Sequence, residues 1–290
     1  MIRLATRSSA QARTQSEVIA KAITTLSGGE HVELVFVETL GDQKADVPLH
    51  VIGGQGVFVK EVQNAVLEGR ADIAVHSAKD LPSFSTPGLV VGAWCERRDA
   101  RDALVGSRLD DLAVGATVAT GSVRRTKQLS IIRPDLQFVE LRGNIHTRLK
   151  KIPDGGAIVM AVAALQVLDL TNQIAEILDP NVVVPMIGQG CVAVECRTND
   201  RSTQDVLKLV DHLPTRRAVE IERTFLAELG AGCSMPVGAY VDEDDVLTTF
   251  MASSAEIDAR WVILRESLAG MSDPYQCAVD MARKSRDSVS

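Results

Sequence analysis

The feature that most constrains the fold is an alternation of short apolar strands with helices, which runs along the chain and then begins again. The first round has an apolar stretch at 2–5, a polar loop at 6–9 and a helical pattern that ends near Leu26. The second has a strand at 116–120 and a polar loop at 121–125 that opens a helix. Alternating strands and helices predict parallel α/β sheets, and the shared layout predicts two similar α/β domains.

Two segments have the composition of crossings between these domains. Residues 96–102 are highly charged, and residues 185–190 contain proline and glycine. Two crossings indicate that the chain returns to its first domain, and a cleft between the domains would then hold a ligand. A small α+β domain is expected at the end, from three strand patterns followed by a helix. We predict domain 1 at 1–95 and 190–212, domain 2 at 98–187 and domain 3 at 214–290.

The charge balance and the cysteines exclude several classes of protein. With 38 acidic and 31 basic side chains the net charge is −7, whereas nucleic-acid binders are normally basic. No run approaches the roughly 18 apolar residues of a membrane span, and the N-terminus has no signal-peptide pattern. The five cysteines form no Cys-x-x-Cys pair. We therefore expect a reduced, cytoplasmic protein without a metal site, a nucleic-acid partner or a membrane partner, and we expect a monomer.

Three polar turns that carry arginine follow predicted strands. Because parallel strands end at one edge of a sheet, these turns should meet there. The free N–H groups of a helix start favour an anion, and the planar guanidinium suits carboxylates. A single arginine of this kind is usually solvated surface, but three such turns favour a cleft for a polyanion. The residues concerned are Arg7 and Ser9, then Thr120, Ser122, Arg124 and Arg125, then Arg142 and Arg148.

The densest polar cluster is His76-Ser77-Ala78-Lys79-Asp80-Leu81-Pro82, which follows a short buried strand. The carboxylate of Asp80 could support a developing positive charge or move a proton, and Ser77 and Lys79 could bind an anion. A merely polar turn closed by Pro82 would have the same composition. From this cluster alone, the two interpretations are equally supported.

Two glycine-rich loops complete the candidate sites. Cys233 lies between Gly232 and Ser234, and Pro236 fixes the exit of its loop. A lone cysteine is more often a small packed side chain than a reactive group, so the loop by itself favours that interpretation. The stretch Gly53-Gly54-Gln55-Gly56 does not lead into the lysine of a phosphate-binding loop, and we interpret it as a flexible lid.

Taken in order, these stretches resemble the porphobilinogen deaminase (hydroxymethylbilane synthase) family. The resemblance runs nearly from end to end, and the combination of motifs is far more specific than any one of them. It is carried by Ala5-Thr6-Arg7-Ser8-Ser9, Gly53-Gly54-Gln55-Gly56-Val57-Phe58-Val59-Lys60-Glu61, the stretch 75–82, Arg101-Asp102-Ala103-Leu104, Ser122-Val123-Arg124-Arg125, Leu141-Arg142-Gly143-Asn144, Gly188-Gln189-Gly190, Glu195-Cys196-Arg197, Glu222-Arg223 and the Cys233 loop.

The resemblance implies a fold and an activity. The fold would be two domains like type II periplasmic binding proteins plus a small α+β C-terminal domain. The activity would join four porphobilinogen molecules, with loss of ammonia, to a dipyrromethane primer held by Cys233 as a thioether. Hydrolysis would then release hydroxymethylbilane for tetrapyrrole (haem) biosynthesis. Asp80 would be the catalytic carboxylate, stabilising the electron-poor azafulvene that remains when ammonia leaves.

The resemblance also implies roles for the remaining site residues. An active-site loop would include Gln55, Phe58 and Lys60. Two departures concern positions that are usually basic, Gln55 and Val167, and they leave open a relative that elongates poorly. An anion receptor without chemistry is the other alternative, because fold does not fix function. The side chains expected to bind cofactor and substrate carboxylates are Arg7, Ser9, Ser77, Lys79, Thr120, Ser122, Arg124, Arg125, Arg142, Arg148 and Arg223.

Overall fold

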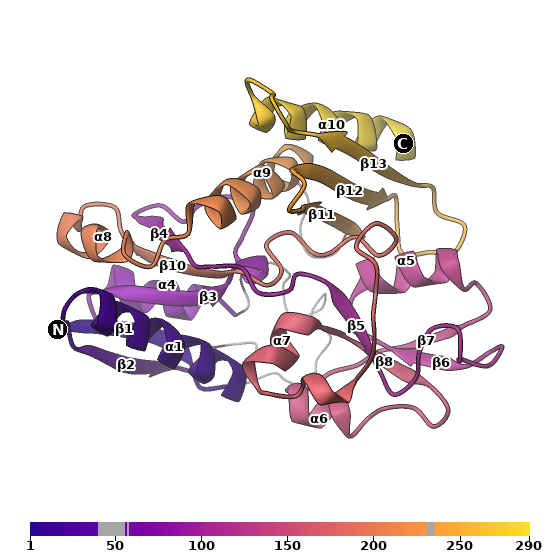
Figure 1. Cartoon of the computed structure of the whole chain (residues 1–290), viewed down its shortest axis with the longest axis horizontal. Helices are drawn as coiled ribbons and strands as arrows, with labels where there is room; N and C mark the ends of the chain where they lie inside the picture. The colour runs from indigo at the N-terminus through magenta and orange to yellow at the C-terminus, as the bar shows by residue number, and fades with distance from the viewer. Residues whose placement is uncertain (40–55, 57, 231–234) are drawn as a thin grey trace. The chain divides into compact units, whose positions relative to one another are not determined.

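The computed structural model describes residues 1–39, 56, 58–230 and 235–290 (Figure 1). The chain divides into two compact units, each made of two separate stretches. Unit 1 contains residues 1–98 and 191–217, and unit 2 contains residues 99–190 and 218–290. The chain therefore leaves unit 1 after residue 98, returns to it at residue 191 and leaves it again after residue 217. The first two of these changes fall at the two predicted crossings. The boundaries expected for three domains remain a prediction.

Unit 1 is built on a five-stranded sheet with the order β2-β1-β3-β10-β4. β1 is parallel to β2 and β3, whereas β10 is antiparallel to both of its neighbours. The strands are β1 (Ile2–Arg7), β2 (Val32–Val37), β3 (Ile73–Ser77), β4 (Leu89–Trp94) and β10 (Val192–Arg197), and the helices are α1 (Ala10–Leu26), α4 (Lys60–Leu67), α8 (Arg201–Leu207) and the 3-10 turn η1 (Ala78–Asp80).

Unit 2 contains a second five-stranded sheet with the order β7-β6-β8-β5-β9. β6 is parallel to β7 and β8, and β5 is antiparallel to β8 and β9. The strands are β5 (Asp102–Val105), β6 (Thr117–Ala119), β7 (Gln137–Val139), β8 (Ala157–Ala161) and β9 (Ile174–Ile177), and the helices are α5 (Val123–Ile132), α6 (Ile145–Leu149), α7 (Val162–Val167) and the 3-10 turn η2 (Thr171–Gln173).

The two large sheets share one strand order. In each, the first strand of the round lies between the second and the third, and one antiparallel strand separates the third from the last. The expectation of two similarly built α/β domains is confirmed. The expectation of wholly parallel sheets is wrong, because β5 and β10 follow the two crossings and enter their sheets without a helical connection from a neighbouring strand.

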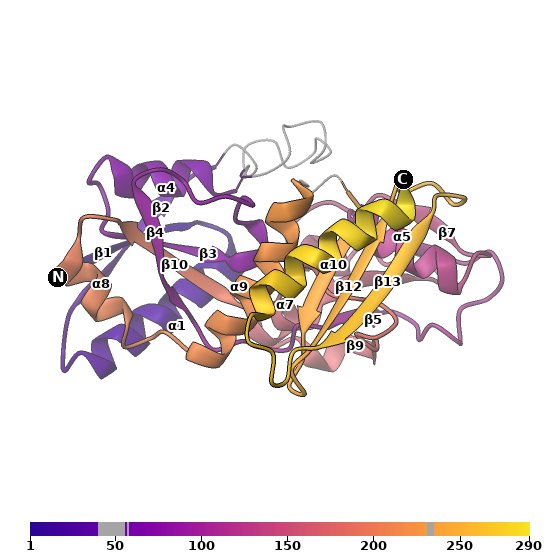
Figure 2. The ribbon, with the colours of Figure 1, turned by 90° about the horizontal axis from the view of Figure 1, so that it is seen from above.

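The C-terminal part of unit 2 is a three-stranded antiparallel sheet, β11-β12-β13, with one helix packed on it (Figure 2). Apolar side chains of that helix, among them Ala278 and Met281, share a core with Leu247 and Met251 of the middle strand. This is the predicted small α+β arrangement. Its elements are α9 (Leu213–Leu229), β11 (Val237–Val241), β12 (Val246–Ala252), β13 (Trp261–Ser267) and α10 (Pro274–Val289).

Alternation along β1 and β3 explains the layers of unit 1. Leu4 and Ile73 point to one face, where they pack with Ile19 and Ile23 of α1. Their neighbours Ala5 and Ala74 point to the other face and pack with Val62 and Val66 of α4. Successive side chains of a strand lie on opposite faces, so two short apolar strands are sufficient to hold a helix on each side.

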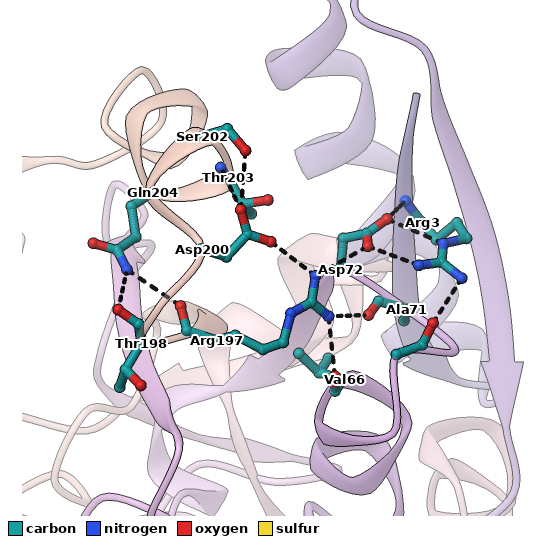
Figure 3. Close-up of polar contacts among 11 residues, drawn as sticks. Arg3, Val66, Ala71, Asp72, Arg197, Thr198, Asp200, Ser202, Thr203 and Gln204 are labelled. Carbon is teal, nitrogen blue, oxygen red and sulfur yellow. Dashed lines mark hydrogen bonds and ion pairs between the residues drawn. The ribbon is translucent and has the colours of Figure 1, made fainter.

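A network of ion pairs links β1, β3 and β10 at the end of the unit 1 sheet where β1 and β3 begin (Figure 3). The Asp72 carboxylate accepts hydrogen bonds from the Arg3 backbone N–H at 2.9 Å, from Arg3 Nη2 at 2.8 Å and from Arg197 Nη2 at 3.3 Å. Arg197 Nη1 also donates to the carbonyl oxygens of Val66 and Ala71. Burial alone would raise the pKa of the Asp72 carboxyl, but the hydrogen bonds from both arginines lower it to about 2.

Candidate active site

In unit 1, two of the predicted polar turns meet at one edge of the sheet. β1 and β3 run parallel with Ala5 opposite Ala74, so both strands end at the edge away from the Asp72 network. After β1 the chain turns into α1, where the Ser9 hydroxyl accepts a hydrogen bond from the Ala12 N–H at 3.3 Å. After β3 it enters the 3-10 turn that contains Asp80. The turn after β1 and the Asp80 turn therefore lie at the same edge of the unit 1 sheet. The expectation that all three arginine turns share one sheet edge is wrong, because the Arg7 turn belongs to the unit 1 sheet and the other two belong to the unit 2 sheet.

The Asp80 turn has a fixed backbone and partly exposed polar side chains. The Ala78 N–H donates to the Cys191 carbonyl oxygen at 3.0 Å, and the Leu81 N–H donates to the Ala78 carbonyl oxygen at 3.2 Å. Lys79 and Asp80 are half-exposed, whereas Ala78 is buried. A turn anchored in this way can present a carboxylate and an ammonium group to a ligand without losing its shape.

Arg7 and Phe58 are in contact, which the sequence did not predict. The guanidinium carbon of Arg7 lies 4.0 Å from the centroid of the Phe58 ring, in the range of a cation–π interaction. Lys60 is the exposed first residue of α4, and its N–H donates to the Gly56 carbonyl oxygen at 3.0 Å. Phe58 therefore lies beside a predicted carboxylate-binding residue, and Gln55 lies outside the described residues.

His76 is turned into unit 1 and does not share the exposure of the residues that follow it. Its Nε2 lies 3.1 Å from Glu195 Oε2, and both side chains are buried. The same carboxylate oxygen accepts a hydrogen bond from Gln63 Nε2 at 2.7 Å, and Gln63 Oε1 accepts one from the Thr86 hydroxyl at 3.0 Å. The strand before Asp80 is thus tied to α4, to β10 and to the loop that follows the turn.

In unit 2, the residues of the other two polar turns also share an edge. β6 and β7 are parallel with Ala119 opposite Val139, which places Thr120 and Ser122 at the edge where residues 141–144 begin. The Ser122 hydroxyl caps α5 by accepting from the Arg125 N–H at 3.4 Å, and Thr120 Oγ1 accepts from the Ser122 N–H at 3.3 Å. Arg148 Nε donates to the Gly143 carbonyl oxygen at 2.7 Å, so the loop after β7 is held by the helix that follows it.

Arg124 and Arg125 are buried and share one carboxylate. Asp102, the first residue of β5, is fully buried, and its two oxygens accept from Arg124 Nη2 and Arg125 Nη2, each at 2.6 Å. Gln189 Nε2 donates to Asp102 Oδ1 at 2.8 Å and to the Ala100 carbonyl oxygen at 2.7 Å. Burial alone would raise the pKa of the Asp102 carboxyl, but the charges of Arg124 and Arg125 hold it well below its usual range.

This cluster has one more positive than negative charge. Two guanidinium groups face the single carboxylate of Asp102, and Arg124 Nε is buried with no hydrogen-bond partner in the part of the chain that the structure describes. Burial of an uncompensated charge is costly, so a cluster of this kind is stabilised by an anion nearby. Its chemistry therefore fits a ligand that carries several carboxylates, at the capped start of α5.

Three further positions singled out in the sequence are Arg223, Cys233 and Val167. Arg223 lies half-buried on α9, and Cys233 is outside the described residues. Val167, where a basic residue was expected, is a buried residue of α7, and its neighbour Gln166 is exposed. Among the residues that the structure describes there is no group of side chains spaced to hold a metal ion, and none of the described helices is long and apolar enough to cross a membrane.

Sequence reasoning missed the roles of Asp102, Gln189 and Glu195. All three stand in stretches that carry the family resemblance, but none was given a function there. For Asp102 the residue type was a usable signal. An acidic residue at the start of the apolar strand Ala103-Leu104-Val105 is expected to be buried, and a buried carboxylate needs a positively charged or hydrogen-bonding partner.

Two five-stranded sheets of one strand order, followed by a small antiparallel sheet, define a mixed α/β protein with polar turns at the ends of its strands. A family model described as the dipyrromethane cofactor binding domain of porphobilinogen deaminase matches residues 2–205, and one described as the C-terminal domain of porphobilinogen deaminase matches residues 216–284. The chain belongs to the porphobilinogen deaminase family.

Two relatives show the extent of the likeness. A porphobilinogen deaminase of Acidothermus cellulolyticus is 44% identical over 309 residues, covering 100% of this chain and 91% of its own length. One from Thermobifida fusca is 47% identical over 246 residues, covering 83% of this chain and 76% of its own length. Among solved structures, the methionine-binding protein MetQ matches with a TM-score of 0.45 and 14% identity, over 77% of this chain and 89% of that protein.

Proposed function

We propose that this chain is a transferase that joins four porphobilinogen molecules, with loss of ammonia, to a dipyrromethane primer and releases hydroxymethylbilane by hydrolysis. The observation that carries the proposal is the meeting of the Asp80 turn with Arg7 and Ser9 at one sheet edge, in a chain of the porphobilinogen deaminase family. A general acid or base and anion-binding groups are what this chemistry requires of a protein. The product belongs to tetrapyrrole biosynthesis.

Asp80 is the residue to which we assign proton transfer and stabilisation of charge. When ammonia leaves porphobilinogen, positive charge develops on the pyrrole, and a fixed carboxylate nearby lowers the energy of that state. The backbone hydrogen bonds of Ala78 and Leu81 hold the Asp80 turn, so its carboxylate needs little reorganisation during the reaction. Lys79 lies next to it and can bind a substrate carboxylate.

The dipyrromethane, held as a thioether by Cys233, supplies the primer to which the new pyrroles are joined. Its acidic side chains would be bound at the unit 2 edge by Thr120, Ser122 and the excess positive charge of Arg124 and Arg125. We assign the same task to Arg142, Arg148 and Arg223 in unit 2, and in unit 1 to Ser77 and to Arg7, whose guanidinium contacts Phe58. We assign Gln55, Phe58 and Lys60 to the predicted active-site loop and its junction with α4, whose first residue is Lys60.

Intact-protein mass spectrometry tests the covalent primer. The wild-type chain, purified from a host that makes porphobilinogen, should exceed its polypeptide mass by two pyrrole units, and Cys233→Ala should not. Cys277→Ala is the matched control, because Cys277 is a half-buried free cysteine in the C-terminal part of the chain, and it should keep the excess mass. An unmodified wild-type mass would contradict the proposal of a covalent primer and would favour an anion receptor without catalytic activity.

The role of Asp80 is tested by Asp80→Asn, which keeps the shape of the side chain but removes its charge. Turnover of porphobilinogen should fall by two or more orders of magnitude, as expected for loss of a catalytic acid or base, while the thermal unfolding midpoint changes little. Asp205→Asn, at an exposed ion pair with Lys208, should leave both quantities unchanged. Turnover of Asp80→Asn close to wild type would exclude the assignment.

We further propose that the protein acts as a cytoplasmic monomer with no nucleic-acid or membrane partner. The net charge of −7 and the reduced state implied by the five cysteines support this proposal. Light scattering coupled to size exclusion should give the mass of one chain, and a mass of two or more chains would contradict it.

A further inference from the structure

Helix α5 carries a second functional surface besides its capped start. Lys127 is fully buried, and its Nζ donates to the carbonyl oxygens of Glu256 at 2.7 Å and Ile257 at 2.9 Å. Both carbonyl groups belong to the loop between β12 and β13, which lies next to α5 in Figure 1. Ile257 itself is exposed, so a buried ammonium group holds an exposed loop of the C-terminal sheet.

The next residue of α5, Gln128, holds the segment that leads to that sheet. Gln128 Oε1 accepts from the Val184 N–H at 2.7 Å, and Gln128 Nε2 donates to the Val184 carbonyl oxygen at 3.0 Å. Arg124 Nη1 donates to the same carbonyl oxygen at 2.6 Å. Residues 124, 128 and 131 are spaced to lie on one face of a helix, and Ile131 packs against a cluster formed by Val184 and Phe250 of β12.

The held segment is in direct contact with β11. The Ala239 N–H donates to the Pro185 carbonyl oxygen at 3.2 Å. A Cβ atom at Gly238 would lie 2.8 Å from the carbonyl oxygens of both Val184 and Pro185, so only glycine allows this approach. Val184 is held by α5 and contacts β11, and Lys127 of α5 holds the loop after β12. Both parts of the C-terminal sheet are therefore anchored to the same helix.

We propose that Lys127 and Gln128 are positioning residues, which hold the C-terminal domain in one register on the helix whose start binds ligand carboxylates. The inference rests on the proposed function, in which Cys233 of that domain carries the primer. With the domain fixed on α5, the attached pyrroles are presented to Ser122, Arg124 and Arg125 in a defined place. A displacement of about 1 Å far from the reacting atoms can cost about 100-fold in rate.

The test compares Lys127→Met with Lys127→Arg. Methionine has a similar length but no donor, so the carbonyl groups of residues 256 and 257 lose their partner, whereas arginine can still donate to both. We expect Lys127→Met to keep the primer mass but to lower kcat/KM for porphobilinogen roughly tenfold, about 1.4 kcal/mol, mainly through KM. Under limiting substrate its partly elongated species should persist on the chain, and Lys127→Arg should restore most of the activity.

Met281→Ala is the stability control, because Met281 lies in the core of the same domain but on α10. If Lys127→Met and Met281→Ala have equal unfolding midpoints and equal kinetic constants, Lys127 is only structural and the inference is overturned. If wild-type protein lacks the primer mass, the proposed function fails instead, and the two failures are distinguished by the same spectra. A Lys127→Arg variant as slow as Lys127→Met would also overturn the inference.

Discussion

At the scale of single residues, Asp72 and Asp102 show that the same side chain can be placed in different environments. Each carboxylate is held by two arginines. Asp72 joins the starts of two strands to the end of a third and retains access to solvent, whereas Asp102 is fully buried beside the start of α5. Asp80, by contrast, is half-exposed.

Asp72→Asn should make unit 1 less stable in a way that depends on pH. The folded pKa of about 2 lies below the unfolded value of about 3.9. The ionised carboxylate therefore stabilises the fold above about pH 4, and this stabilisation is lost as the pH falls from about 4 through 2. We expect a loss of about 1–3 kcal/mol at pH 7. Urea unfolding at several pH values measures the difference, and a difference as large at pH 2 as at pH 7 would contradict the assignment.

At the scale of elements, α10 contains a buried hydroxyl group without a hydrogen-bond partner in the described chain. Ser285 is fully buried on the face that packs on the C-terminal sheet, and its hydroxyl has no hydrogen-bond partner in the described chain. An unsatisfied buried hydroxyl group costs about 1–3 kcal/mol. Ser16 of α1 is equally buried, but its hydroxyl donates to Thr6 Oγ1 at 2.7 Å.

The two serines form a matched pair for mutation to alanine. Ser285→Ala should raise the free energy of unfolding by roughly 1 kcal/mol, because it removes an unsatisfied group and alanine is the better helix former. Ser16→Ala should lower it by about 1 kcal/mol, because it breaks a buried hydrogen bond. Chemical denaturation of both variants measures the sign, and a destabilised Ser285→Ala would imply a bound water or other partner for that hydroxyl.

Elements with a clear period and local signals could be predicted from the sequence. α1 ends at Leu26 as expected, and the three strands and the helix expected at the end of the chain are β11, β12, β13 and α10. The sequence pattern also favours a helix over 205–212, but Asp200 caps α8 by accepting from the Thr203 N–H, and α8 runs from Arg201 to Leu207. β5 and β9 were not predicted, because four residues show no reliable period and their stability comes from distant neighbours.

The same limit applies to the candidate site. The strand-to-helix turns were predictable because their polar residues follow apolar strands directly. The sharing of Asp102 between Arg124 and Arg125 was not, because it depends on β5 lying between β8 and β9, a pairing across more than 50 residues that no local pattern records. The contact of Arg7 with Phe58 is long-range in the same sense.

At the scale of the whole molecule, the separate cores of the two units predict separate responses to mutation. Hydrogen exchange of the native protein should be faster in β1 and β3 of Asp72→Asn than in wild type, and unchanged in β12. In Ser285→Ala, exchange should slow in β12 and stay unchanged in β1. Compact units open independently when each has its own apolar core. A uniform change across both units in either variant would contradict this prediction.

The place of β10 in the sheet also bears on how the protein is made. Among the described strands, β4 pairs with β10 alone, and residues 95–191 separate the two in the chain. During synthesis, the part of the chain that emerges first therefore has to wait, with the buried strand that contains Ala93 and Trp94 still unpaired. An exposed unpaired strand is prone to aggregation. For this chain, the first half to leave the ribosome is also the half that cannot finish folding until the second has been made.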